Sequence, residues 1–204
     1  MKMNIPNKLT LTRIILVPVF MVFMVYDFGL SDAGKYAWPR IISASIFILA
    51  AITDFLDGKI ARARKLITNF GKFMDPLADK FMIFGAMTAI CFSNYALNAG
   101  FLRHFFFWAT TIVIFRELAV TSMRLVVSTN SGVVVAASFL GKLKTVTQII
   151  CVCVVMLEPV IFNYEIFYKY RLLSVVATIV AVVFTVLSGW NYLKAYWGSI
   201  STDK

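Results

Sequence analysis

The sequence has 204 residues, of which 60% are hydrophobic and only 15% charged, and its mean hydropathy is +0.83. This composition excludes a soluble globular protein, and apolar runs near the roughly 20 residues that cross a bilayer recur along the chain. The formal net charge of +10 does not indicate a nucleic-acid partner, because basic residues in a membrane protein set topology and contact anionic lipid head groups.

Six membrane-spanning helices are predicted, and no linker or repeat divides them into domains. In chain order they are expected at Leu11–Phe28, Pro39–Arg62, Gly71–Ser93, Leu102–Val127, Lys144–Phe162 and Leu172–Lys194. The stretch NIPNKLTLTR, residues 4–13, is predicted to form a short helix along the membrane interface before the first span. The sequence thus predicts an all-α integral membrane protein, a single six-helix bundle over residues 1–204.

The basic residues predict which side of the membrane each loop occupies. With both chain termini on one side, fifteen of the twenty lysines and arginines lie nearer that side and five nearer the other. The five are Lys35, Arg40, Arg103, Lys169 and Arg171. Because positively charged loops tend to remain in the cytoplasm, both termini are expected to be cytoplasmic, together with the loops at residues 63–70 and 128–143.

Four aspartates lie in two of these apolar helices, within the stretch DFLDGKIARARKLITNFGKFMDPLAD, residues 54–79. Asp54 and Asp57 are three residues apart near the end of the second predicted helix, so they share a helix face. Asp75 and Asp79 are four apart near the start of the third, and share a face likewise. A short connection makes the two helices an antiparallel hairpin, so two carboxylate pairs are expected to face each other within roughly 5–15 Å of the cytoplasmic boundary.

Four carboxylates in one cage require cations to remain ionised. Two hard divalent cations, Mg²⁺ or Mn²⁺, suit carboxylate oxygens and would balance the four charges. The alternative is that Lys59, Arg62 and Lys80 neutralise the aspartates as structural ion pairs. The neighbouring Gly58, Ala61 and Gly71 allow close approach of a ligand or, equally, of one helix to another.

The whole stretch reads D-x2-D-G-x2-A-R-x8-G-x3-D-x3-D, which resembles the signature of the CDP-alcohol phosphotransferase family. The resemblance implies an enzyme, expected to be a homodimer in a bacterial cytoplasmic membrane, that transfers the phosphatidyl group of CDP-diacylglycerol to an alcohol and releases CMP. It implies that Asp54, Asp57 and Asp75 hold two divalent metal ions, and that Asp79 adjoins these ions and acts as the base. The residues expected to bind the CDP-lipid are Asn7, Thr10, Gly58, Ala61, Arg62 and Gly71.

The acceptor alcohol is predicted from basic residues in the second half of the chain. RELAVTSMR, residues 116–124, and SFLGKLKTVTQ, residues 138–148, resemble, together with NIPNKLTLTR, the branch of the family whose acceptor is glycerol 3-phosphate. A phosphate needs cationic partners, whereas serine or a neutral alcohol does not. The four cations expected to bind it are Arg116, Arg124, Lys142 and Lys144.

Other interpretations of these residues stay open. Glu117 and Arg124 are seven apart and can pair across two helical turns, and Lys142 and Lys144 can simply mark the membrane boundary. Within the family, the acceptor can instead be inositol phosphate or phosphatidylglycerol. A divalent-cation transporter is a different class, which would require carboxylates near the midplane and a polar path to the far side. The outer halves of the two aspartate-bearing helices offer only small hydroxyls for such a path.

Overall fold

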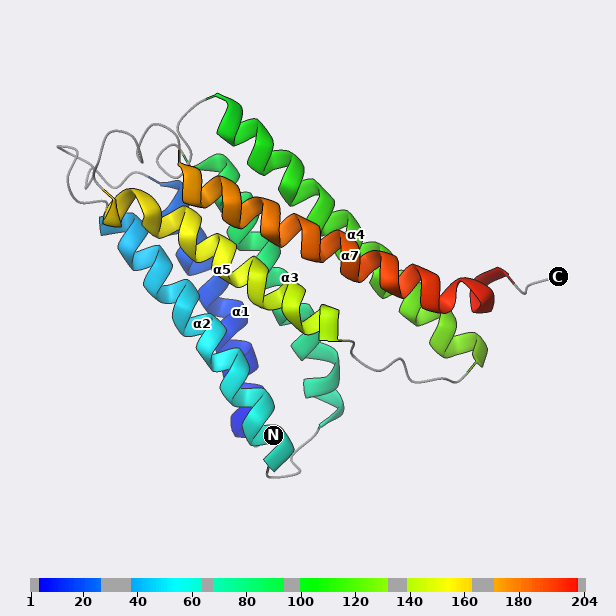
Figure 1. Ribbon diagram of the computed structural model, residues 1–204. Helices are drawn as coiled ribbons and strands as arrows, with labels where there is room; N and C mark the ends of the chain where they lie inside the picture. The colour runs from blue at the N-terminus through cyan, green and yellow to red at the C-terminus, as the bar shows by residue number, and fades with distance from the viewer. Residues whose placement is uncertain are drawn as a thin grey trace.

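The computed structural model describes residues 4–26, 38–63, 68–93, 100–131, 139–162 and 171–201. Within these ranges it describes every side chain except those at positions 5, 57, 59–63, 69, 72, 128–131 and 198–201. The described residues form six α-helices and no strand, as expected for an all-α protein (Figure 1). The helices are α1 (Ile5–Val25), α2 (Trp38–Ala63), α3 (Asn69–Phe92), α4 (Phe101–Ser131), α5 (Phe139–Ile161) and α7 (Leu172–Ser201).

The helices alternate in direction along the bundle. In Figure 1 the first residues of α1, α3 and α5 and the last residues of α2, α4 and α7 lie toward the lower and right-hand side of the view. The predicted aspartates are in the second half of α2 and the first half of α3, and the predicted acceptor-binding cations are at the middle and in the second half of α4 and at the beginning of α5. The alternation therefore brings together, at one end of the bundle, charged residues that are far apart in the sequence.

The N-terminal stretch differs from its prediction, because it is not a separate interfacial helix. Residues 5–13 are the first turns of α1, which continues without interruption to Val25. Pro6 occupies a first-turn position, where its missing N–H costs no hydrogen bond, and the backbone N–H of Lys8 already donates to the carbonyl of Asn4 at 3.1 Å. Nothing between Pro6 and Pro18 breaks the helix, so the polar stretch and the apolar stretch form one element.

Four of the described helices are long and apolar enough to cross a membrane. Their candidate spans are Pro6–Val25, Trp38–Leu56, Phe139–Ile161 and Leu172–Trp197. The helices α3 and α4 have sufficient length, with 24 and 31 residues, but charged residues interrupt their apolar sequences. With several helices of this kind, the protein is a multi-pass membrane protein.

The helix α1 packs against both α2 and α3, which contact each other much less. Phe20 of α1 and Phe47 of α2 are fully buried and meet edge to face, with ring centroids 5.8 Å apart. On the other side of α1, Gly85 of α3 allows close approach, since a Cβ atom there would lie 2.9 Å from Cγ1 of Val17. The predicted hairpin of α2 and α3 thus contains α1 as a third member, which lies against both helices.

The helix α7 packs against α4 and α5 through a row of buried hydroxyls. The residues in this row are Ser174, Thr178, Thr185 and Ser188. Gln148 of α5 donates to Thr185 Oγ1 at 2.9 Å, and the buried carboxylate of Glu158 accepts from the backbone N–H groups of Leu173 and Ser174 at 3.1 and 2.9 Å. These contacts satisfy buried polar groups in the middle of α7 and at its beginning, where the first N–H groups of a helix have no partner within the helix.

Candidate active site

A cluster of carboxylates lies where the beginning of α1 meets the end of α2 and the beginning of α3. The guanidinium of Arg13, in α1, contacts Asp54 of α2 and Asp79 of α3 through the same nitrogen. Nη1 lies 2.6 Å from Oδ1 of each aspartate, so these two oxygens are no farther apart than twice that distance. The Arg13 side chain is fully buried, whereas the aspartate side chains remain 31% and 49% exposed. We call this group, together with Asp75, the carboxylate cluster.

Asp75 is oriented by the preceding turn of α1. The hydroxyl of Thr10 donates to Asp75 Oδ1 at 2.8 Å. Thr10 and Arg13 are three residues apart and therefore share a face of α1, from which one reaches Asp75 and the other reaches Asp79. All the described aspartates of the motif are thus contacted from a single helix face.

One turn earlier, Asn7 fixes the start of α3. Its Oδ1 accepts from the hydroxyl of Thr68 at 3.0 Å, and Thr68 Oγ1 accepts in turn from the backbone N–H of Gly71 at 3.0 Å, capping α3. A Cβ atom at Gly71 would lie 3.2 Å from Asn7 Oδ1 and 3.7 Å from Asp75 Oδ2. The absence of a side chain at position 71 therefore lets Asn7 and Asp75 approach the same backbone segment.

The structure brings Asn7, Thr10, Gly71, Asp54, Asp75 and Asp79 to one end of the bundle. Gly58 is partly buried on α2. The side chains of Asp57, Ala61 and Arg62 lie outside the described part of the structure, as does that of Lys59. The ligand, base and lipid-binding roles that the sequence indicates for all these residues remain predictions.

Arg13 is the member of this cluster that sequence reasoning missed, because it was counted only as a basic residue that sets topology. A signal was present in the sequence. Asn7, Thr10 and Arg13 recur every three residues at the start of a helix that is apolar from Ile14 onward, so they lie along one side of it. The proposed ion pairing of Lys80 with the aspartates is not what the structure shows, since Lys80 Nζ donates to Thr121 Oγ1 at 2.6 Å.

The chemistry of the carboxylate cluster suits a hard divalent cation. The Oδ1 atoms of Asp54 and Asp79 both lie 2.6 Å from Arg13 Nη1, so they are close enough together to contact one cation, and carboxylate oxygens are the ligands that Mg²⁺ prefers. Among the side chains that the structure describes, no three histidine, cysteine or carboxylate groups lie close enough to share one ion. Asp57, which the motif adds to the donor set, is not among them.

A second charged cluster lies between α4, α5 and α7. Arg116 Nη1 donates to Glu117 Oε1 at 3.0 Å, and the ammonium of Lys144 pairs with the same carboxylate oxygen. Arg116 Nη2 donates to Ser188 Oγ at 2.6 Å, and Gly189 leaves space for the arginine stem, with Cγ only 3.0 Å from where a Cβ atom would stand. We call Arg116, Glu117 and Lys144 the basic cluster, because two buried or half-buried cations share one carboxylate.

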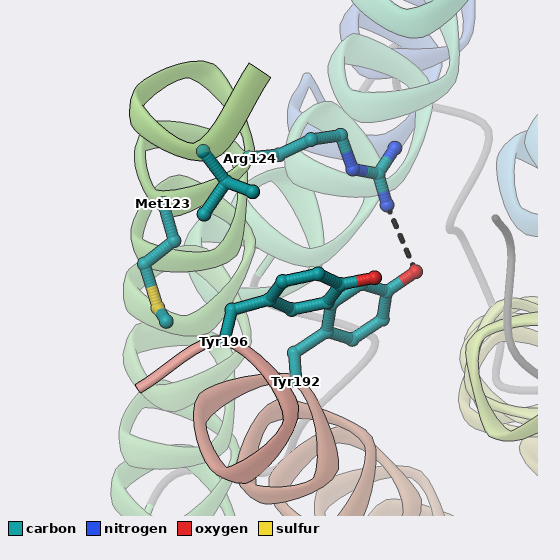
Figure 2. A pocket seen from close by; sticks show the side chains of 5 residues that line it. Met123, Arg124, Tyr192 and Tyr196 are labelled. Atoms are coloured by element: carbon teal, nitrogen blue, oxygen red, sulfur yellow. Dashed lines mark hydrogen bonds between the residues drawn. The ribbon is translucent and has the colours of Figure 1, made fainter. Parts of the chain in front are cut away.

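Arg124 lies two turns further along α4, beside a small pocket between α4 and α7 (Figure 2). Its Nη2 donates to the hydroxyl of Tyr192 at 3.0 Å, and its guanidinium carbon lies 5.5 Å from the centre of the Tyr192 ring. The guanidinium of Arg116 lies 5.9 Å from the same ring. Tyr192 is thus the α7 residue that both arginines contact, and sequence reasoning did not select it. The described partners of Glu117 are Arg116 and Lys144, not Arg124.

Lys142 is exposed near the beginning of α5 and has no contact with the basic cluster among the residues that the structure describes. The two charged clusters are nevertheless adjacent to each other. Lys80 follows Asp79 in α3 and donates to Thr121 of α4, and Thr121 Oγ1 donates to the backbone carbonyl of Glu117 at 2.7 Å. A carboxylate-rich region and a cation-rich region therefore lie side by side at one end of the bundle.

Comparison with known proteins agrees with the motif. A family model described as CDP-alcohol phosphatidyltransferase matches residues 3–187. The chain is 41% identical over 204 residues to a CDP-diacylglycerol–glycerol-3-phosphate 3-phosphatidyltransferase of Bacillus subtilis strain 168, with 98% of each chain covered. It is 33% identical to the protein of that name from Salmonella typhimurium strain LT2 and 31% to the one from Yersinia pestis strain Pestoides F, again over 98% of each chain.

Proposed function

The chain belongs to the CDP-alcohol phosphatidyltransferase family, and from this premise we propose that it transfers the phosphatidyl group of CDP-diacylglycerol to glycerol 3-phosphate. The products are phosphatidylglycerophosphate and CMP, so the enzyme contributes to anionic phospholipid synthesis. The relatives named above carry this activity in their names. The observation that supports it in the structure is the contact from Lys80 to Thr121, which sets the basic cluster beside the carboxylate cluster.

The carboxylate cluster would activate the donor lipid and the attacking hydroxyl. Asp54, Asp57, Asp75 and Asp79 would hold two divalent ions, Mg²⁺ or Mn²⁺, which when bound neutralise charge on the pyrophosphate and on the departing CMP. Asp79 would accept the proton of the attacking hydroxyl. The hydroxyl oxygen then bonds to the phosphorus of the diacylglycerol phosphate, and the bond from that phosphorus to the CMP oxygen breaks. The Asp79 side chain is 49% exposed, so its carboxylate is accessible to an acceptor.

The cytidine side of the donor would lie against the residues that surround this cluster. Asn7, Thr10 and Gly71 adjoin Asp75, where small or polar groups leave room for a flat base. Gly58, Ala61 and Arg62 would complete this side from α2. The described contacts of Asn7 and Thr10 are with Thr68 and Asp75, so these two residues would also orient the protein groups that hold the donor.

The basic cluster would hold the phosphate of the acceptor. Arg116 and Lys144 share one carboxylate, so together with it they retain one positive charge. Arg124, in the second half of α4, and Lys142, near the beginning of α5, would add two further cations. Glycerol 3-phosphate carries roughly two negative charges near neutral pH, and its phosphate can accept charge-assisted hydrogen bonds from such groups. Binding the phosphate there would direct the free hydroxyl toward Asp79.

Transport of divalent cations would require the polar path to continue across the bundle. Beyond the carboxylate cluster, the hydroxyl of Ser43 donates to the backbone carbonyl of Phe20, and the other buried side chains of α1, α2 and α3 there are mostly apolar. They include Val17, Phe20, Phe47, Met82 and Ala86. This packing favours a site that opens to one side only, as a transferase requires.

The membrane arrangement completes the proposal. We propose that α3 and α4 also span, giving six spans in the cytoplasmic membrane of a bacterium, with both termini and the active site facing the cytoplasm, and that the protein is a homodimer. In a cysteine-free background, Ala99→Cys and Ile166→Cys should react with an impermeant thiol reagent added to intact cells. Ile67→Cys and Gly132→Cys should react only after lysis. Labelling of Ile67→Cys from outside would reverse the orientation.

The acceptor is tested directly with purified protein. CDP-diacylglycerol would be supplied with glycerol 3-phosphate, glycerol, inositol phosphate or phosphatidylglycerol, and CMP release would be measured before and after chelation of divalent ions. We expect release with glycerol 3-phosphate, much slower release with the other acceptors, and none after chelation. Equal turnover of glycerol and glycerol 3-phosphate would refute the acceptor while leaving the family intact.

A further inference from the structure

The contacts of Arg13 carry an inference about the site that goes beyond the activity. We propose that Arg13 is a built-in counter-cation of the carboxylate cluster, which holds Asp54 and Asp79 together in the metal-free protein and lowers the affinity of the site for divalent ions. This inference rests on the proposed use of divalent ions by these aspartates. Arg13 is then a positioning residue that sets the affinity of the aspartates for divalent ions.

The burial of Arg13 is the first ground for this role. Its side chain is fully buried in a helix whose neighbouring residues are largely apolar, and an arginine in that environment requires an anionic partner. The partners are two aspartates from two different helices, and both are considerably more exposed than the arginine. The cation therefore lies on the bundle side of the cluster, and the open side of the carboxylates faces away from it.

The second ground is that one nitrogen contacts both carboxylates. Nη1 carries two hydrogens, so one N–H can be directed to Asp54 Oδ1 and the other to Asp79 Oδ1, each at 2.6 Å. Without a cation between them, two carboxylates this close repel each other. The contact thus connects, through α1, the two helices α2 and α3, which have little direct packing with each other.

The same contact has a consequence for ion binding. Arg13 donates to oxygens of two aspartates that the family motif assigns to the site of divalent ions. A divalent cation that approaches these oxygens meets a fixed positive charge a few ångströms away and competes for the same lone pairs. Removing the arginine charge should therefore tighten ion binding, although it weakens the metal-free protein.

Lys80 provides a matched control. It is a cation immediately after Asp79 in the sequence, but its ammonium contacts Thr121 of α4 and none of the aspartate side chains that the structure describes. Lys80→Met removes the same formal charge as Arg13→Met from the same end of the bundle. A difference between the two variants would therefore report the contact with the carboxylates, and not the net charge of the protein.

The experiment measures Mn²⁺ binding to the purified full-length protein without any lipid substrate, from the electron paramagnetic resonance signal of free Mn²⁺. Thermal unfolding is recorded in parallel, with chelator and with saturating Mn²⁺. We expect Arg13→Met to bind Mn²⁺ at least tenfold more tightly than the wild type and to unfold at a lower temperature with chelator. Its unfolding temperature should also rise more than that of the wild type when Mn²⁺ is added. Arg13→Lys should bind as the wild type does within about threefold, because it retains the charge, and so should Lys80→Met.

Three results would overturn the inference. Mn²⁺ binding to Arg13→Met that is unchanged or weaker would show that the arginine does not oppose the ion, and an equal effect of Lys80→Met would show that only net charge matters. If Arg13→Met fails to fold, Arg13→Gln is used with the same criteria, since it retains a hydrogen-bond donor without the charge. Absence of Mn²⁺ binding to the wild type would refute the proposed metal site itself, and the Arg13 inference with it.

Discussion

The carboxylate cluster and the basic cluster are built in the same way with the charges exchanged. In the first, the buried cation Arg13 lies between Asp54 and Asp79, and Asp75 adds further negative charge. In the second, the carboxylate of Glu117 lies between Arg116 and Lys144. Each cluster thus contains one charge of the opposite sign, which neutralises it only in part and leaves an excess of the other sign. The excess is negative where divalent ions are proposed to bind and positive where a phosphate is.

The two clusters differ in how open they are. The side chains of Asp54 and Asp79 are 31% and 49% exposed, whereas those of Arg116 and Lys144 are 9% and 13% exposed. The cations are shielded because α7 covers α4, and Ser188 and Tyr192 contact the arginines directly. A partly shielded phosphate site gives stronger charge-assisted contacts than an exposed one. The comparison therefore predicts that substitutions in the carboxylate cluster mainly lower turnover, whereas substitutions in the basic cluster mainly weaken binding of the acceptor.

The largest effect is expected from the carboxylates. Asp75→Asn and Asp79→Asn should each reduce turnover by about a thousandfold or more, because losing one charged ligand or the base costs several kcal/mol and each 1.36 is about tenfold in rate. Asp79→Asn should retain affinity for CDP-diacylglycerol if its main role is the base. The measurement is CMP release with both substrates varied.

Glu158→Gln is the control for this prediction, since it alters a buried carboxylate that contacts the first residues of α7, away from both clusters. It should lower the unfolding temperature with little change in turnover per folded enzyme. Near-normal turnover of Asp79→Asn would mean that another group deprotonates the acceptor.

An intermediate effect is expected from the basic cluster. Arg116→Met should raise KM for glycerol 3-phosphate by about 10- to 100-fold, since a charge-assisted contact contributes about 1.5–3 kcal/mol. The phosphate binds alike in the ground state and the transition state, so kcat and KM for CDP-diacylglycerol should change much less. Lys142→Met, at an exposed position of α5, should have a smaller effect. If KM for glycerol 3-phosphate were unchanged in both variants and in Lys144→Met, the acceptor phosphate would not bind at this cluster.

A smaller effect is expected from Tyr192, which links the two arginines of α4. Tyr192→Phe removes the hydroxyl that accepts from Arg124 but keeps the ring that both guanidinium groups contact. We expect KM for glycerol 3-phosphate to rise about three- to tenfold, as for loss of one hydrogen bond of about 0.5–1.5 kcal/mol. Tyr196→Phe is the control, because Tyr196 stacks on Tyr192 and has no described bond to Arg124. Equal KM values for the two variants would show that the Tyr192 hydroxyl positions nothing.

The smallest effects are expected from substitution of two glycines, one beside each cluster, and the two variants should differ in which kinetic constant changes. In Gly189→Ala the new methyl group would lie 3.0 Å from Cγ of Arg116, which can shift, so KM for glycerol 3-phosphate should rise about two- to threefold. In Gly71→Ala the methyl group would crowd Asn7 and the Thr68 cap, which contributes about 1 kcal/mol to α3. Gly71→Ala should therefore affect turnover of the CDP-lipid and not acceptor KM. The same kinetic change in both variants would argue against two separate regions.

Helical structure and the spacing of the charged residues follow from the sequence alone, because both depend on local covalent geometry. Apolar runs of membrane-spanning length predict the helices, and the intervals between Asp54 and Asp57 and between Asp75 and Asp79 place each pair on one face. The motif was specific enough to indicate the family, which the comparison with known proteins confirmed. Helix ends were less accurate, since α1 begins before Leu11 and α7 continues beyond Lys194.

Only the tertiary structure decided which helices lie between the charged pairs. The sequence predicts that α2 and α3 face each other, but it does not show that α1 packs against both and inserts Arg13 between Asp54 and Asp79. Lateral neighbours depend on how closely backbones approach, and here Gly85 lets α3 approach Val17 of α1. For the same reason Glu117 pairs with Arg116 and Lys144 and not with Arg124: the partner of a charged side chain is set by the helix beside it, which spacing along its own helix does not reveal.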